Sequence, residues 1–125
     1  MSQSQTGFQR SFVAAADLSG DQYRFVSYGS QNEVARSEAN AADAAGVLIN
    51  GPTEGEHANV QWLGSVKAIA GAELSTPGTE VTTDGEGRVV AATAGQNVVG
   101  RTVDTAEAAG DEIEIFLTLG ARVPA

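Results

Sequence analysis

Short apolar segments closed by turn-forming residues recur along residues 23–119, and this repetition constrains the fold more than any other feature of the chain. Glycine, proline, asparagine and aspartate separate the segments, and these residues favour tight turns. The segments are residues 47–49, 60–63, 66–69, 81–83, 88–90, 98–99 and 113–117. Several short strands at such spacing are typical of a β-barrel or β-sandwich. No long helical pattern alternates with them, so a Rossmann-like βαβ fold is not expected.

The strongest single strand pattern covers residues 113–119. Apolar residues there alternate with Glu114, Phe116 and Thr118, as expected for a strand with one buried face. Further strands are predicted at residues 23–28, 33–36, 46–49, 58–63, 66–69 and 98–103. The sequence DGEG at residues 84–87 predicts a hairpin loop, the rest of residues 31–45 is expected to be mostly loop, and residues 106–110 hold one helical turn at most. We therefore expect a mainly β fold with short strands and little helix.

The length of 125 residues predicts one small domain, and the scarcity of aromatic residues indicates a thin, tightly packed core. The expected organisation is a flexible N-terminal arm at residues 1–12, followed by a single β-rich domain at residues 13–125. Residues 1–7 are polar without apolar periodicity, which is typical of a flexible segment. The sequence contains no cysteine, signal-peptide pattern or membrane-spanning apolar run, so we expect a soluble protein without disulfides.

The charge of the chain is strongly negative. Seven lysines and arginines oppose sixteen aspartates and glutamates, for a formal net charge of −9. Direct nucleic-acid binding and docking on an anionic membrane are not expected, because both need clustered cations. Lys67 is the only lysine. An acidic, lysine-poor surface is typical of adaptation to high salt, where screening reduces self-repulsion, and it is also compatible with an ordinary acidic protein.

No catalytic residue, metal ligand or cofactor site is predicted. His57, the only histidine, would have to serve any Ser-His-Asp arrangement, but it lies in a polar turn and is expected to be solvated. Asp84 and Glu86 match a calcium loop only in part, because further oxygen ligands and a terminal glutamate are missing. Lys67 would be the modified residue of a lipoyl- or biotinyl-type carrier, but it lies inside a predicted strand rather than at a hairpin tip.

Aromatic residues and an arginine supply the candidate contacts with a partner. Phe8, Arg10 and Phe12 are the candidate anchor of the N-terminal arm, and a strand that enters the core is the alternative for the two phenylalanines. Trp62 is the only tryptophan. It either fills the core, which we favour, or lies in an interface, since tryptophan is enriched among residues that dominate binding energy.

The segments also follow one another in a recognisable order. The series is AAADLS (14–19), YRFV (23–26), GVLINGP (46–52), GEHANV (55–60), Gly64 with VKA (66–68), AGA (70–72), VTTDGEG (81–87), VGR (99–101) and GDEI (110–113). This series resembles the small capsid decoration, or cement, proteins of tailed phages and archaeal tailed viruses, and the resemblance covers residues 12–119. The acidic bias and the shortage of lysine depart from the family's pattern, and residues 120–125 lie outside it.

The resemblance implies a small β-barrel of the tulip type and a virion protein without enzymatic activity or cofactor. It implies binding to the outer surface of the mature icosahedral head, with the major capsid protein as partner, as a homotrimer at three-fold and quasi-three-fold positions. The N-terminal arm would contact the capsid protein, in part by adding a strand. Arg10, Arg24 and Arg36 are candidates to pair with capsid carboxylates, and ordinary surface solvation is the alternative. Trp62 is a candidate oligomer or capsid contact.

Two other classes of function remain open at this point. One is a small hydrolytic domain or a lipoyl- or biotinyl-like carrier, which a modified Lys67 or an activity dependent on His57 would favour. The other is a different virion β module, such as a tail component, which its place in the particle would separate from a head protein.

Overall fold

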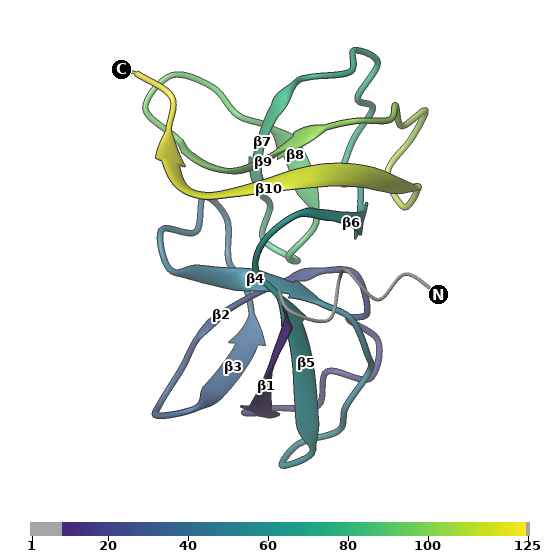
Figure 1. Cartoon of the computed structure of the whole chain (residues 1–125). Helices are drawn as coiled ribbons and strands as arrows, with labels where there is room; N and C mark the ends of the chain where they lie inside the picture. The colour runs from purple at the N-terminus through teal and green to yellow at the C-terminus, as the bar shows by residue number, and fades with distance from the viewer. Residues whose placement is uncertain (1–8, 125) are drawn as a thin grey trace.

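This computed structural model describes residues 9–124, which contain ten strands and no helix. The strands form two stacked units (Figure 1). The barrel unit contains β1 (Gln9–Ala14), β2 (Phe25–Tyr28), β3 (Glu33–Arg36), β4 (Ala44–Leu48) and β5 (His57–Gln61). The second unit contains β6 (Ser65–Ile69), β7 (Glu80–Thr83), β8 (Val89–Ala91), β9 (Asn97–Thr102) and β10 (Glu112–Arg122). The predicted mainly β fold with a small barrel is therefore confirmed.

The barrel unit is closed, with the strand order β1-β3-β2-β4-β5. β1 completes it by pairing antiparallel with β5 and parallel with β3. Its pairing with β3 is short, because only Val13 and Ala14 have partners there. The interior holds mostly small and medium-sized side chains, namely Phe12, Ala14, Leu18, Val26, Val34, Ala45, Leu48, Ala58 and Val60. Such residues fit a barrel of few strands, because its interior is narrow.

The second unit is an antiparallel sheet with the strand order β6-β10-β9-β7-β8. A bridge between Ala70 and Val89 brings the end of β6 close to β8, so the sheet curls back toward itself. β10 is the longest strand, and Ile113, Ile115 and Leu117 on it are buried. The predicted alternation over residues 113–119 is thus confirmed as far as Leu117.

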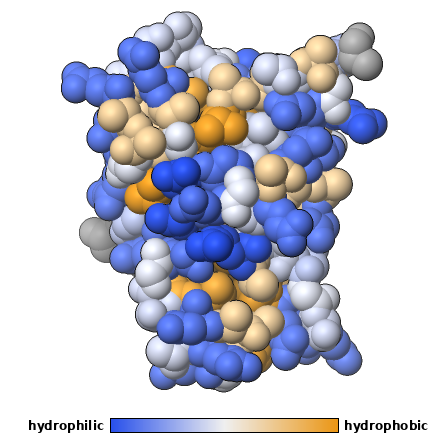
Figure 2. Space-filling model, turned by 180° about the vertical axis from the view of Figure 1, so that it is seen from behind, coloured by the Kyte–Doolittle hydropathy of each residue, from blue (hydrophilic) through white to orange (hydrophobic). Residues whose placement is uncertain are grey.

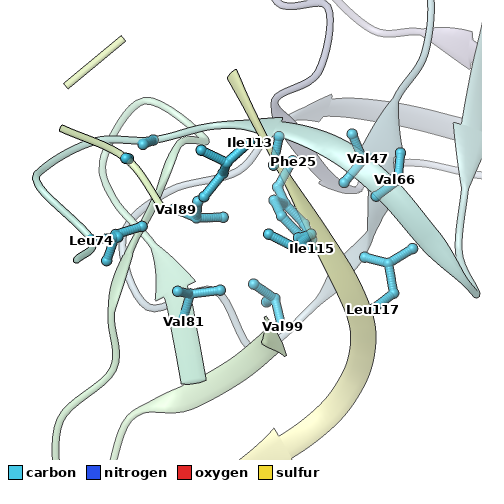
Figure 3. Close-up of a cluster of buried hydrophobic side chains, with 13 residues drawn as sticks. Phe25, Val47, Val66, Leu74, Val81, Val89, Val99, Ile113, Ile115 and Leu117 are labelled. Atoms are coloured by element: carbon cyan, nitrogen blue, oxygen red, sulfur yellow. The ribbon is translucent and has the colours of Figure 1, made fainter. Parts of the chain in front are cut away.

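The two units share a core. Phe25 and Val26 are neighbours on β2, yet both are fully buried. Val26 packs inside the barrel, whereas Phe25 packs with Ile115 and other residues of the second unit. Figure 3 shows Phe25 among side chains from the second unit, close to Ile115. The second unit therefore covers the outer face of the barrel at β2. For this reason Phe25 and Val26 do not show the alternation of buried and exposed residues that an uncovered barrel wall would have.

Main-chain hydrogen bonds fasten the units at Tyr23. The Tyr23 N–H donates to the Leu48 carbonyl (2.7 Å), and the Tyr23 carbonyl accepts from the Ile69 N–H (3.1 Å). Tyr23 has a φ of 67°, which a bulky residue rarely adopts. The strand predicted from residue 23 therefore begins only at Phe25. On the far side of the molecule, hydrophilic residues form a band across the middle, where the units meet (Figure 2).

Local predictions agree well with the observed elements. The short strand at residues 33–36 coincides with β3, and the loop at residues 84–87 joins β7 to β8. Residues 106–110 contain no helical turn. Of the predicted arm, residues 9–12 lie in β1, while residues 1–8, including Phe8, lie outside the described residues. Within residues 9–124, no helix has the length and apolar character needed to cross a membrane.

Candidate functional site

His57 lies on the open outer wall of the barrel. Its Nδ1 is 3.3 Å from the Ser11 Oγ, and both residues are exposed. The neighbouring Glu56 carboxylate accepts a hydrogen bond from the Thr53 N–H instead of orienting the imidazole. A serine–histidine contact in this setting lacks the oriented and shielded geometry that nucleophilic catalysis requires. The predicted solvation of His57 is confirmed, but His57 is the first residue of β5 and does not lie in the polar turn expected from the sequence.

Lys67 lies in the middle of β6, opposite Glu114 on β10, and its side chain is exposed. The Lys67 Nζ is 5.9 Å from the centre of the Tyr23 ring, a weak cation–π contact. The predicted strand-interior position is confirmed, and it differs from the hairpin tip at which carrier domains present their lysine.

The Asp84 carboxylate is occupied by donors of its own loop. It accepts hydrogen bonds from the Glu86 and Arg88 N–H groups and from the Arg88 Nε at 2.8 Å. Burial raises the pKa of the Asp84 carboxyl, but these donors and the Arg88 charge outweigh burial, so the pKa is lowered. The loop therefore holds its own turn together. In residues 9–124, no group of three or more histidine, aspartate or glutamate side chains is arranged to hold a metal ion.

Two of the candidate arginines form ion pairs within the chain. Arg24 lies 3.6 Å from Glu86 and joins the barrel to the β7–β8 loop. Arg36 lies 3.7 Å from Asp21, in an open groove of about 670 Å³ next to β3. Both pairs leave part of the guanidinium exposed, so contact with a partner remains a prediction for Arg24 and Arg36.

The remaining candidates occupy two places. Trp62 lies in the linker between β5 and β6 and is 44% exposed, so the core position that we favoured from the sequence is wrong. The linker runs over the surface as it passes from the barrel unit to the second unit, and Leu63 beside Trp62 is exposed as well. Arg10 and Phe12 belong to β1, with the Arg10 guanidinium 4.5 Å from the centre of the Phe12 ring. Phe12 is buried in the barrel core, as the strand alternative predicted.

The outer face of the second unit carries exposed apolar residues. Phe116 on β10 is 54% exposed, opposite Arg101 of β9 and Ser65 of β6. Val103 lies beside this strand, because its N–H donates to the Glu114 carbonyl. Leu63 precedes Gly64, whose carbonyl accepts from the Leu117 N–H. We call Leu63, Val103 and Phe116 the Phe116 patch.

Charged residues surround the Phe116 patch. Arg101 forms an ion pair with Glu80 at 3.3 Å on one side. On the other side, an open groove of about 380 Å³ is lined in part by Lys67, Glu112 and Glu114. An exposed apolar centre with a polar and charged rim is typical of a protein–protein contact surface.

Sequence reasoning assigned Phe116 to the solvated face of its strand and did not single it out. The signal was present, because an aromatic residue at a position otherwise held by Glu and Thr departs from the polar pattern. Alternation identified the face correctly, but it could not indicate whether a partner covers that face.

Comparison with solved structures finds a protein that shares this fold. The crystal structure of the N base of the head fibre gp8.5 from bacteriophage phi29 matches with a TM-score of 0.70. The match covers 94% of this chain and 98% of that chain, at 18% sequence identity. The two chains therefore share a fold over almost their full lengths. No family model matches this chain, and no curated protein matches it.

Proposed function

We propose that this chain is a structural protein of a viral head, a decoration or cement protein on the outer surface of the mature capsid. The observation that carries the proposal is the shared fold with a phage head fibre base, which extends over 94% of this chain. The ordered series of motifs that resembles decoration proteins points the same way. A fold alone does not define a function, so the surfaces must supply the rest of the argument.

Three copies associate through the Phe116 patch in this proposal. Exposed apolar residues around an aromatic centre, with Arg101 at the edge, have the composition of interface cores. The units of this chain are thin, so association also buries apolar surface that a single copy leaves exposed. A trimer then spans neighbouring capsid subunits around a three-fold or quasi-three-fold position.

Stabilisation of the shell follows from linkage. A protein that binds only the assembled, mature lattice lowers the free energy of that state relative to separated subunits. Three linked copies add avidity, because the second and third contacts form within one complex. This role requires no covalent chemistry.

The charge supports a position outside the shell. A subunit with a net charge of −9 would be repelled by packaged DNA inside the head, although counterions reduce this repulsion. Outside the shell, the same charge keeps the particle surface hydrated and soluble.

Imaging of the intact particle at subunit resolution tests the proposal. We expect density with this two-unit fold on the outer surface of the head, at three-fold and quasi-three-fold positions. Density or antibody labelling along the tail would assign the protein to a tail component instead. Absence from purified particles, or a turnover reaction that requires His57, would overturn a structural role in the head.

A further inference from the structure

Within residues 9–124, one edge of β1 has no strand partner near its start. In the pairing with β5, the Ala14 N–H donates to the Glu56 carbonyl, so the residues that hydrogen-bond across this pair are Ala14, Phe12 and Arg10. The main-chain groups of Gln9 and Ser11 consequently point to the opposite side. The Val13 N–H also points there, and it donates to the Asn32 carbonyl. No residue of 9–124 pairs with Gln9 or Ser11 on that side.

The gap exists because β3 begins late. Asn32 adopts a φ of 62°, and the chain turns there before β3 starts at Glu33. Glu33 pairs with Val13, so a longer β3 would have continued beside Ser11. Among the described strands, β3 therefore pairs with only one end of β1, and none pairs with the same side of Gln9–Ser11. We call these three residues the β1 edge.

Arg10 stands at this edge and is held there by an amide and an aromatic ring. Its NH2 group donates to the Asn32 Oδ1 at 3.0 Å, and its guanidinium lies over the Phe12 ring. No carboxylate in residues 9–124 forms an ion pair with Arg10, whereas Arg24, Arg36 and Arg88 each have one. A guanidinium has five N–H donors, so Arg10 keeps donors for an external anion while its orientation is already fixed.

Tyr28 completes the surface. It is 59% exposed, and its ring packs edge-to-face on Phe12, with ring centres 6.1 Å apart. An exposed aromatic ring, a held arginine and free main-chain groups thus lie around one strand edge. This combination matches the way in which proteins bind extended peptide segments, by main-chain pairing with side-chain pockets for specificity.

We propose that the β1 edge binds an extended segment of the major capsid protein as an added strand, and that Arg10 pairs with a carboxylate on this segment. Charge complementarity selects an acidic segment, because Arg10 is the cation at the edge and no carboxylate of residues 9–124 pairs with it. This inference rests on the proposed function for the identity of the partner. The sequence led us to expect that the N-terminal arm of this protein adds a strand to the capsid protein. In the present proposal the roles are exchanged: the capsid protein supplies the added strand, and this protein supplies the strand edge.

Proline substitution tests the main-chain pairing. Ser11→Pro removes an N–H that points outward and keeps the hydrogen bonds of Arg10 and Phe12 to β5, so the fold should persist. Ala91→Pro is the matched control, because Ala91 is exposed on the edge strand β8 and opposite Val81, with its N–H pointing away from β7. Binding is measured on purified expanded shells that lack this protein. We expect Ser11→Pro to weaken binding at least about tenfold and Ala91→Pro to leave it unchanged.

Charge reversal tests the arginine. Arg10→Glu should weaken shell binding at least about tenfold, and the loss should shrink in high salt. Arg122→Glu is the control, since Arg122 also has no ion pair in the described residues and donates only to the Gly95 carbonyl. A photo-crosslinking residue at position 11 should join this protein to the capsid protein, and one at position 91 should not.

The outcomes separate the two proposals. If the wild-type protein does not bind shells, the proposed function fails, and this choice of partner fails with it. If the wild-type protein binds and both Ser11→Pro and Arg10→Glu bind equally well, the inference is overturned while the proposed function stands. Crosslinks from position 11 only to another copy, or to residues 1–8 of the same chain, would also overturn it.

Discussion

Phe116→Ala should weaken self-association without unfolding the protein. Phe116 lies on the outer face of β10 and is 54% exposed in the single chain. The neighbouring Ile115 and Leu117 side chains hold the strand on the core and are unaffected by the change. The cost to the isolated chain should stay below about 1 kcal/mol, which is the range of strand propensity differences.

The effect on association can be worked out from the exposed area. A phenylalanine presents about 200 Å² in total. An exposure of 54% leaves about 110 Å² for an interface to bury. At about 25 cal/mol per Å², this area stabilises the assembly by about 2.7 kcal/mol per copy. The dissociation constant per subunit should therefore rise about a hundredfold in Phe116→Ala.

Sedimentation analysis over a range of protein concentrations measures this change directly. Tyr28→Ala is the matched control, because Tyr28 is 59% exposed on the barrel unit, away from the Phe116 patch. We expect its association to equal that of the wild type. An unchanged oligomeric state in Phe116→Ala, with association lost in Tyr28→Ala instead, would refute the assignment of the patch as the trimer contact.

Three further changes probe the fold itself. Gly46→Ala should destabilise the protein by more than about 3 kcal/mol in urea unfolding, because Gly46 has a φ of 151° and the new Cβ would overlap the Gln61 carbonyl. Gly20→Ala is the control and should be close to neutral, because the space around Gly20 is open. Equal effects of the two substitutions would contradict this account. Phe25→Ala should lower the free energy of unfolding by about 3–5 kcal/mol and speed amide hydrogen exchange in both units. Faster exchange in the barrel unit alone would show that the shared core does not couple the two units. Because the folded state lowers the pKa of Asp84, the ionised carboxylate stabilises the fold at pH values above the ordinary pKa of the group, and this contribution disappears as the pH falls through the folded-state pKa. The wild type should therefore lose more stability than Asp84→Asn between about pH 5 and pH 2. Parallel profiles of stability against pH for the two proteins would contradict this contribution of Asp84.

Local elements were largely predictable because their signals are local. Glycine and aspartate at residues 84–87 specify a hairpin loop whatever surrounds them, and the loop is present between β7 and β8. Alternation over residues 113–117 identifies the inward face of β10 in the same way. The turn residue Asn32 shows the limit of this reasoning, because its effect on the barrel depends on which strand lies beside β3.

The candidate site was only partly accessible from the sequence. Arg10 and Phe12 were selected as contact residues, but their place in β1 depends on pairing with β5, more than forty residues away in the chain. For Trp62 the core was favoured over an interface, although the linker that carries it runs over the surface. Phe116 was overlooked, because hydrophobicity alone does not distinguish an interface residue from a tolerated exposed one.

The amino-acid pattern on its own determined the strands, the turns and the acidic surface, since each depends on neighbouring residues or on the sum of charges. Tertiary structure alone decided that the chain divides into two five-stranded units with a shared core, that Phe25 and Val26 are buried on opposite sides of one strand, and that β1 keeps an open edge. The physical reason is that the burial of a strand face and the pairing of a strand edge depend on segments distant in the chain, and no local pattern records which segment packs there.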